Sequence, residues 1–169
     1  MSLAPFDLWP DQLVDGASGL RAWFVPPRFV VMQFPGPVFT ELGARASVQA
    51  VDDVIAALGA QLRANGGLVM MNDVRACTTV ERGAQVVIQA AWKRLDPRDL
   101  AEAWVFKGDV SFLASTVLGM VNRVAAFATG KTQRVVAAPD EVLARYRLGP
   151  PPPDVRFPAA PHLAAAVRR

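Results

Sequence analysis

The stretch LVMMNDVRACTTVERGAQV, residues 68–86, decides the fold prediction. It opens with an apolar run over residues 68–74, which is typical of a strand buried on both faces of a sheet. Thr78-Thr79-Val80-Glu81 then has the form of a capping box, in which Thr78 caps a helix and Glu81 reaches back to it. The helix is expected to stop at Asp96-Pro97. One of its faces is apolar and consists of Ala84, Val87, Ile88, Ala91, Trp92 and Leu95.

Two strands and a helix are predicted before this stretch. LRAWFV (20–25) and RFVVMQF (28–34) are rich in Val, Phe and Trp and are separated by Pro26-Pro27, which favours a hairpin at the edge of a sheet. Asn65-Gly66-Gly67 is expected to end the helix that follows. Between residues 47 and 64 the apolar residues recur at spacings of three and four, as on one helix face: Val48, Val51, Ile55, Leu58 and Leu62.

The alternation continues toward the C-terminus. AEAWVFKG (101–108) and TQRVVAA (132–138) are interpreted as strands, with a long helix from Asp109 to about Ala128 between them. Pro139-Asp140-Glu141 starts a last helix, whose apolar residues are Val142, Leu143 and Tyr146.

This order of elements predicts an α/β domain with a mostly parallel sheet and covering helices over residues 20–148. Residues 1–19 are interpreted as a loosely structured lead-in. Residues 149–169 are interpreted as a proline-rich tail that extends from the domain.

Composition and charge exclude several classes of function. Apolar residues are 52% and charged residues 20%, which is globular, and the net charge is only +3. No Lys/Arg run is interleaved with aromatic residues, so nucleic-acid binding is excluded as a first hypothesis. The longest apolar segment, 110–128, contains Asn122 and Arg123 and is not a membrane span. The lone Cys77 and the absence of a signal-peptide pattern favour the cytoplasm.

AAFATGKT, residues 125–132, matches a permissive phosphate-binding loop. Such a loop leaves a strand and enters the N-terminus of a helix, where backbone N–H groups meet the anion. Here the order is reversed, because the motif follows a helix and precedes a strand. Gly130 is therefore interpreted as the residue that stops the helix, and Lys131 as a cation at its negative end.

No other residues assemble a catalytic site, so a non-enzymatic protein without a cofactor or metal is expected. The only histidine, His162, lies in the tail. Cys77 precedes a helix, and a small buried side chain is a better interpretation of it than a nucleophile. Asp73 and Arg75 flank the end of the central strand, where ligands of α/β sheets bind, although an ion pair or a helix-positioning contact explains them equally well.

Two sets of apolar residues remain. Trp9, Trp23, Trp92 and Trp104 are expected to pack in the core. The long helix is apolar on nearly all sides, so either the N-terminal segment or the tail covers it, or a protein partner or a second copy does. A partner or a second copy is the preferred interpretation, through residues such as Val117 and Val121.

The order of elements over residues 20–147 resembles a STAS domain, in particular the divergent SpoIIAA-like group of anti-sigma-factor antagonists. The strand ending in Asp73, its loop and the closing PDEVLARY are similar to that group. The resemblance implies a phosphorylated Ser or Thr after the central strand, but the matching positions hold Glu81, Arg82 and Gly83.

The resemblance therefore implies a regulatory or scaffolding domain that lacks the usual phosphorylated residue. It would bind a protein through the loop and helix start that hold Asp73, Arg75, Thr78, Thr79, Glu81 and Arg82. SpoIIAA-like sequences also resemble the lipid-binding SEC14 type. That resemblance implies the alternative, a pocket for a lipid or another hydrophobic ligand.

Overall fold

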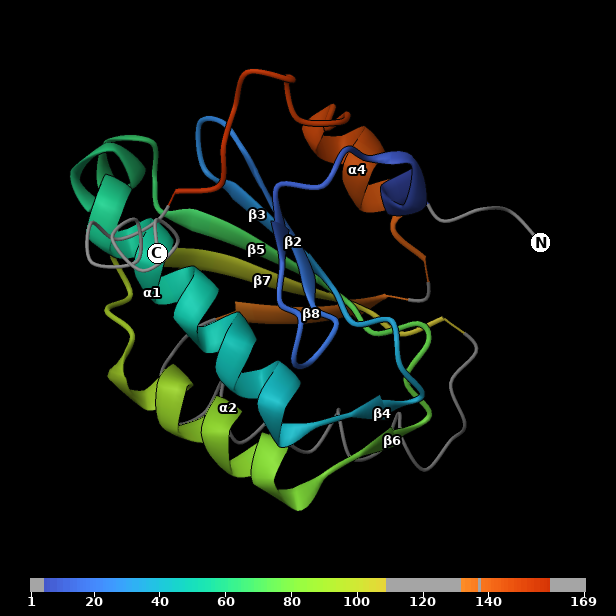
Figure 1. Cartoon of the computed structure of the whole chain (residues 1–169). Helices are drawn as coiled ribbons and strands as arrows, with labels where there is room; N and C mark the ends of the chain where they lie inside the picture. Colours follow the sequence, from blue (N-terminus) through green and yellow to red (C-terminus); the bar gives the residue numbers. More distant parts are fainter. Residues whose placement is uncertain (1–4, 109–131, 137, 159–169) are drawn as a thin grey trace, which may run out of the picture.

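The structure, a computed structural model, describes residues 5–108, 132–136 and 138–158. Its centre is a six-stranded sheet (Figure 1). The first two pairings in the sheet are antiparallel, and the three that follow are parallel, which confirms the mostly parallel α/β fold. In sheet order the strands are β1 (Leu13–Val14), β2 (Arg21–Val25), β3 (Phe29–Gln33), β5 (Leu68–Asp73), β7 (Leu100–Phe106) and β8 (Thr132–Val136).

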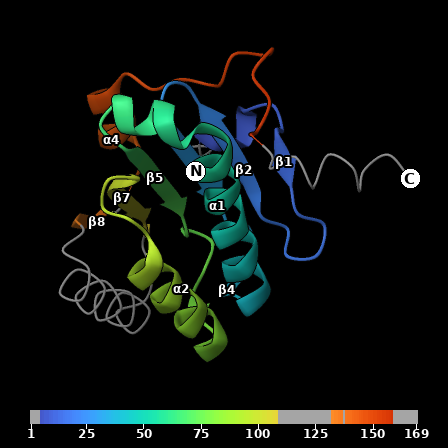
Figure 2. The ribbon, with the colours of Figure 1, turned by 90° about the vertical axis from the view of Figure 1, so that its left-hand side faces the viewer.

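Helices cover both faces of this sheet. Two of them, α1 (Glu41–Ala64) and α2 (Arg82–Arg94), lie side by side on one face (Figures 1 and 2). The short 3-10 helix η1 (Pro5–Leu8) and the helix α4 (Asp140–Tyr146) lie on the opposite face. Strand β5 is buried from both sides, since Met70 packs toward α1 and α2 while Met71 packs in the core beside α4. The prediction for residues 68–74 is confirmed.

The expected hairpin forms, but it does not lie at the edge of the sheet. β2 and β3 pair in an antiparallel manner, β1 adds outside β2, and β3 pairs with β5. The sequence prediction was wrong because a two-residue strand such as β1 carries no alternation that could be recognised.

The expected lead-in is ordered where the structure describes it. Phe6 is fully buried and Trp9 is 5% exposed, and both pack against Trp23. The first ten described residues of the expected tail also return to the domain, where Val155 and Phe157 pack against the core under α1 and α2. Apolar side chains in these proline-containing segments are the physical reason, because burying them stabilises the docked chain.

The first covering helix starts six residues before the predicted Ser47. Thr40 caps it, since the Thr40 side chain accepts a hydrogen bond from the Gly43 N–H at 3.1 Å. The prediction followed the apolar spacing, which becomes regular only after the first turn. The four tryptophans pack in the core as expected, at 0–5% exposure.

The predicted long helix with Val117 and Val121, the stretch up to Lys131 and the tail histidine His162 lie outside the described residues. In the part of the chain that is described, no helix has the length and apolar character needed to cross a membrane.

Candidate functional site

Asp73 and Arg75 form a closed ion pair at the carboxyl end of β5. The Arg75 guanidinium donates from Nε to Asp73 Oδ1 at 2.7 Å and from Nη2 to Asp73 Oδ2 at 2.8 Å. This hydrogen bonding raises the pKa of Arg75. The Asp73 side chain is 4% exposed and that of Arg75 is 24% exposed. This geometry favours an ion pair over a ligand-binding role, because the two side chains bind each other rather than face an open site.

The same end of the sheet holds a polar partner that the sequence did not reveal. Gln33, the last residue of β3, donates from Nε2 to Asp7 Oδ1 at 2.9 Å and to Asp73 Oδ2 at 3.4 Å. Gln33 aligns with Asp73 in the register of β3 and β5. The polar residues that end both strands could have indicated a polar cluster at this edge of the sheet. The contribution of Asp7 could not be predicted, because its segment was interpreted as loosely structured.

Thr78 does not cap α2, which corrects the predicted capping box. The Thr78 hydroxyl donates to the Pro37 carbonyl oxygen at 3.2 Å. Thr79 and Val80 form β6, which pairs in parallel with β4 (Val38–Phe39) in a separate two-stranded sheet. Pairing with β4 holds residues 79–80 in an extended conformation, so α2 begins only at Arg82.

Glu81 caps the other helix. Its Oε2 accepts a hydrogen bond from the backbone N–H of Glu41, the first residue of α1, at 2.7 Å. A carboxylate at a helix N-terminus also interacts favourably with the helix dipole. The Glu41 carboxylate in turn lies over Gly83, in the space that a side chain there would occupy. Of the predicted interaction residues, Thr78, Thr79, Glu81 and Arg82 are exposed at this end of the molecule.

Cys77 is a buried thiol, as expected. It is 4% exposed, and its Sγ lies 3.9 Å from the Phe34 carbonyl oxygen. Burial, and secondarily the charge of Asp73, raises the pKa of Cys77 to about 11. The thiolate form that nucleophilic chemistry requires is therefore scarce at neutral pH.

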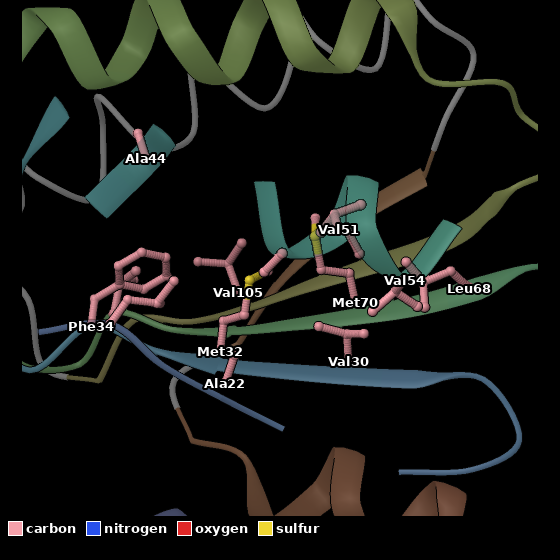
Figure 3. Close-up of a cluster of buried hydrophobic side chains, with 14 of the residues drawn as sticks. Ala22, Val30, Met32, Phe34, Ala44, Val51, Val54, Leu68, Met70 and Val105 are labelled. Atoms are coloured by element: carbon pink, nitrogen blue, oxygen red, sulfur yellow. The ribbon is translucent and has the colours of Figure 1, made fainter. Parts of the chain in front are cut away.

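An apolar cavity lies between the sheet and the helix pair α1 and α2. Its volume is about 80 Å³, and it is partly open to solvent. Figure 3 shows side chains from the sheet and from α1 that line it, among them Met32, Phe34, Val51, Met70 and Val105. The other apolar lining residues in the described part of the chain are Phe39, Val48, Val74, Val80, Ile88, Ala91, Trp92 and Leu95.

Most polar groups in the lining are bound within the protein. The Ser47 hydroxyl donates to the Ala44 carbonyl oxygen at 2.8 Å, and Asn72 Nδ2 donates to the Trp104 carbonyl oxygen at 3.4 Å. Asp52 of α1 and Arg94 of α2 pair with each other at 2.6 Å. Among the described lining residues, the interior of the cavity is apolar, and charge occurs only at Asp52 and Arg94.

Sequence reasoning identified several lining residues but not the cavity. Val48 and Val51 lie on the predicted apolar face of the first helix, and Ile88, Ala91 and Trp92 lie on that of the second. A periodic pattern predicts which side chains turn inward, but not whether they fill the space between them.

Within residues 5–108, 132–136 and 138–158, no three His, Cys, Asp or Glu side chains gather in a way that could hold a metal ion. Comparisons of the chain with protein-family models, with curated proteins and with solved structures find no match.

Proposed function

We propose that this domain is a non-enzymatic binding protein for a small apolar molecule, or for the apolar end of a larger one. The apolar cavity beneath α1 and α2 is the observation that carries the proposal. Ligand sites in proteins are concave and mainly apolar, with a few polar groups that fix orientation. The cavity has this character. The proposal also retains the earlier expectation that the chain is a STAS-like or SEC14-like α/β domain located in the cytoplasm.

The cavity volume limits what fits. An engineered apolar cavity of about 150 Å³ binds benzene. With about 80 Å³, the present cavity in its described form accommodates a short apolar chain or the end of a longer one. Native mass spectrometry of freshly purified protein is the direct test. A bound mass that organic extraction removes supports the proposal, and an unliganded mass that also fails to take up 1-octanol contradicts it.

Filling the cavity should weaken binding without unfolding the protein. Ala91 lines the cavity and is 7% exposed. The Ala91→Leu variant should bind 1-octanol at least about tenfold more weakly, and its stability should stay within about 1 kcal/mol because the added carbons enter unfilled space. Isothermal titration calorimetry and urea denaturation measure the two quantities.

Ala90→Leu is the matched control, since it makes the same change one residue away on the exposed side of α2. It should leave binding unchanged. Equal loss of binding in both variants would contradict the cavity as the binding site.

The second candidate function is a regulatory or scaffolding domain that binds a protein partner or a second copy of itself. One surface favours it: Val38, Leu42 and Val86 are 39%, 57% and 58% exposed. They belong to β4 and to the first two turns of α1 and α2, which lie at one end of the molecule beside Thr78 and Thr79 (Figure 1). Exposed apolar residues at such a site favour association.

Association should depend on these residues. In light scattering coupled to size-exclusion chromatography, Leu42→Asp or Val86→Asp should shift any oligomer toward the monomer. The variants Val117→Asp and Val121→Asp apply the same measurement to the predicted long helix. Ala57→Asp, on the exposed side of α1, is the control. An unchanged assembly in all four test variants would contradict this candidate function.

A further inference from the structure

Asp52 and Arg94 form an ion pair that joins α1 to α2. Arg94 donates from Nη1 to Asp52 Oδ1 at 3.0 Å and from Nη2 to Asp52 Oδ2 at 2.6 Å. Both residues line the cavity and carry the charge among its described lining residues. Their side chains are 31% and 55% exposed, whereas the apolar lining residues on the sheet are buried. The pair therefore stands at the solvent side of the cavity.

Arg94 lies where the part of a ligand that does not fit into the cavity would be placed. The cavity holds only a short apolar chain, so any longer ligand places its remainder outside, where Arg94 lies. A guanidinium is always charged, and its planar fork of five N–H donors binds carboxylates and phosphates through two hydrogen bonds at once. The Asp52 carboxylate accepts hydrogen bonds from two of these N–H donors, and the other N–H donors of the Arg94 guanidinium lie at the same solvent side of the cavity.

Resting on the proposed function, we propose that the ligand is an amphiphile with an anionic headgroup. Its apolar end fills the cavity, and its headgroup replaces the Asp52 carboxylate on Arg94. The carboxylate of Asp52 already occupies the guanidinium fork in the geometry that a ligand carboxylate would adopt. The exchange breaks only an exposed ion pair, which contributes little to stability, and it leaves the displaced Asp52 carboxylate to repel the headgroup.

Octanoate and 1-octanol test the proposal, since the two probes share a chain length and differ in charge. Wild-type protein should bind both in isothermal titration calorimetry. The variant Arg94→Gln should weaken octanoate by about threefold to fivefold, the loss expected for a partly exposed charge pair, and should leave 1-octanol nearly unchanged. Asp52→Asn should strengthen octanoate, because it removes the competing carboxylate.

Arg98→Gln is the matched control. Arg98 pairs with Asp96 at 2.7 Å on the surface and does not line the cavity. It should leave the binding of both probes unchanged. Thermal denaturation of each variant separates loss of binding from loss of folding, and Asp52→Asn carries the test if Arg94→Gln does not fold.

The outcomes separate this inference from the proposed function. If 1-octanol binds and Arg94→Gln leaves octanoate affinity unchanged, the cavity stands and the headgroup assignment is overturned. The assignment is equally overturned if octylammonium binds more tightly than octanoate, since Asp52 would then recognise the ligand. If neither octanoate nor 1-octanol binds to the wild type, the cavity function itself fails.

Discussion

Replacing Gly67 with alanine is expected to lower the free energy of unfolding by about 2–4 kcal/mol. Gly67 connects α1 to β5 with a φ of +90°, a conformation that side chains disfavour. An added Cβ would lie 3.1 Å from the Ala101 nitrogen and 3.2 Å from the Arg98 carbonyl oxygen. Both neighbours are backbone atoms, one within β7 and one just before it, so they cannot move without disturbing a central strand of the sheet.

Two other glycines serve as controls in the same urea denaturation, monitored by tryptophan fluorescence. Gly66 has a φ of +86°, but its added Cβ would meet only the end of the flexible Arg28 side chain, so Gly66→Ala should cost about 1 kcal/mol. Gly59 lies within α1 with nothing near its Cβ position, and Gly59→Ala should stabilise the protein by about 0.5–1 kcal/mol. A Gly67 variant as stable as the Gly66 variant would contradict the close packing against β7.

Removing Arg75 is the second change with a large expected effect. Arg75→Met leaves the Asp73 carboxylate buried without its two strongest hydrogen bonds, and the expected loss is about 3 kcal/mol. Denaturation midpoints and slopes at neutral pH measure this loss.

The double variant Asp73→Asn/Arg75→Met distinguishes an unpaired charge from lost packing. It should be more stable than Arg75→Met alone, because the amide that replaces the carboxylate carries no charge. Arg98→Met, which breaks an exposed pair, should change stability by less than about 0.5 kcal/mol. A double variant less stable than Arg75→Met would show that the buried charge is not the cause.

The elements that could be predicted from the sequence are those with a regular pattern of apolar residues. β5 could be recognised because both of its faces are apolar, and its neighbours pack against both. Val142 and Leu143 were placed correctly, because a short helix that follows Pro139 must bury its apolar residues against the sheet. The ion pair of Asp73 and Arg75 was an open alternative, since two neighbouring charges at a strand end are equally compatible with a ligand.

Features that depend on distant partners could not be predicted. The pattern Thr-Thr-Val-Glu satisfies a local capping rule, yet Glu81 binds a residue forty positions away and residues 79–80 pair with β4. The two-residue strand β4 gives no periodic signal. The cavity depends on the spacing of α1, α2 and the sheet, which the residues on each helix face do not specify.

The cap that Glu81 places on α1 joins two residues that are synthesised at different times. A chain made from its N-terminus presents Glu41 to solvent while the glutamate that completes its helix has yet to be synthesised. Until that residue arrives, the first turn of α1 relies on Thr40 alone. The cap on the first long helix can therefore be completed only after the central strand and Glu81 itself have been synthesised.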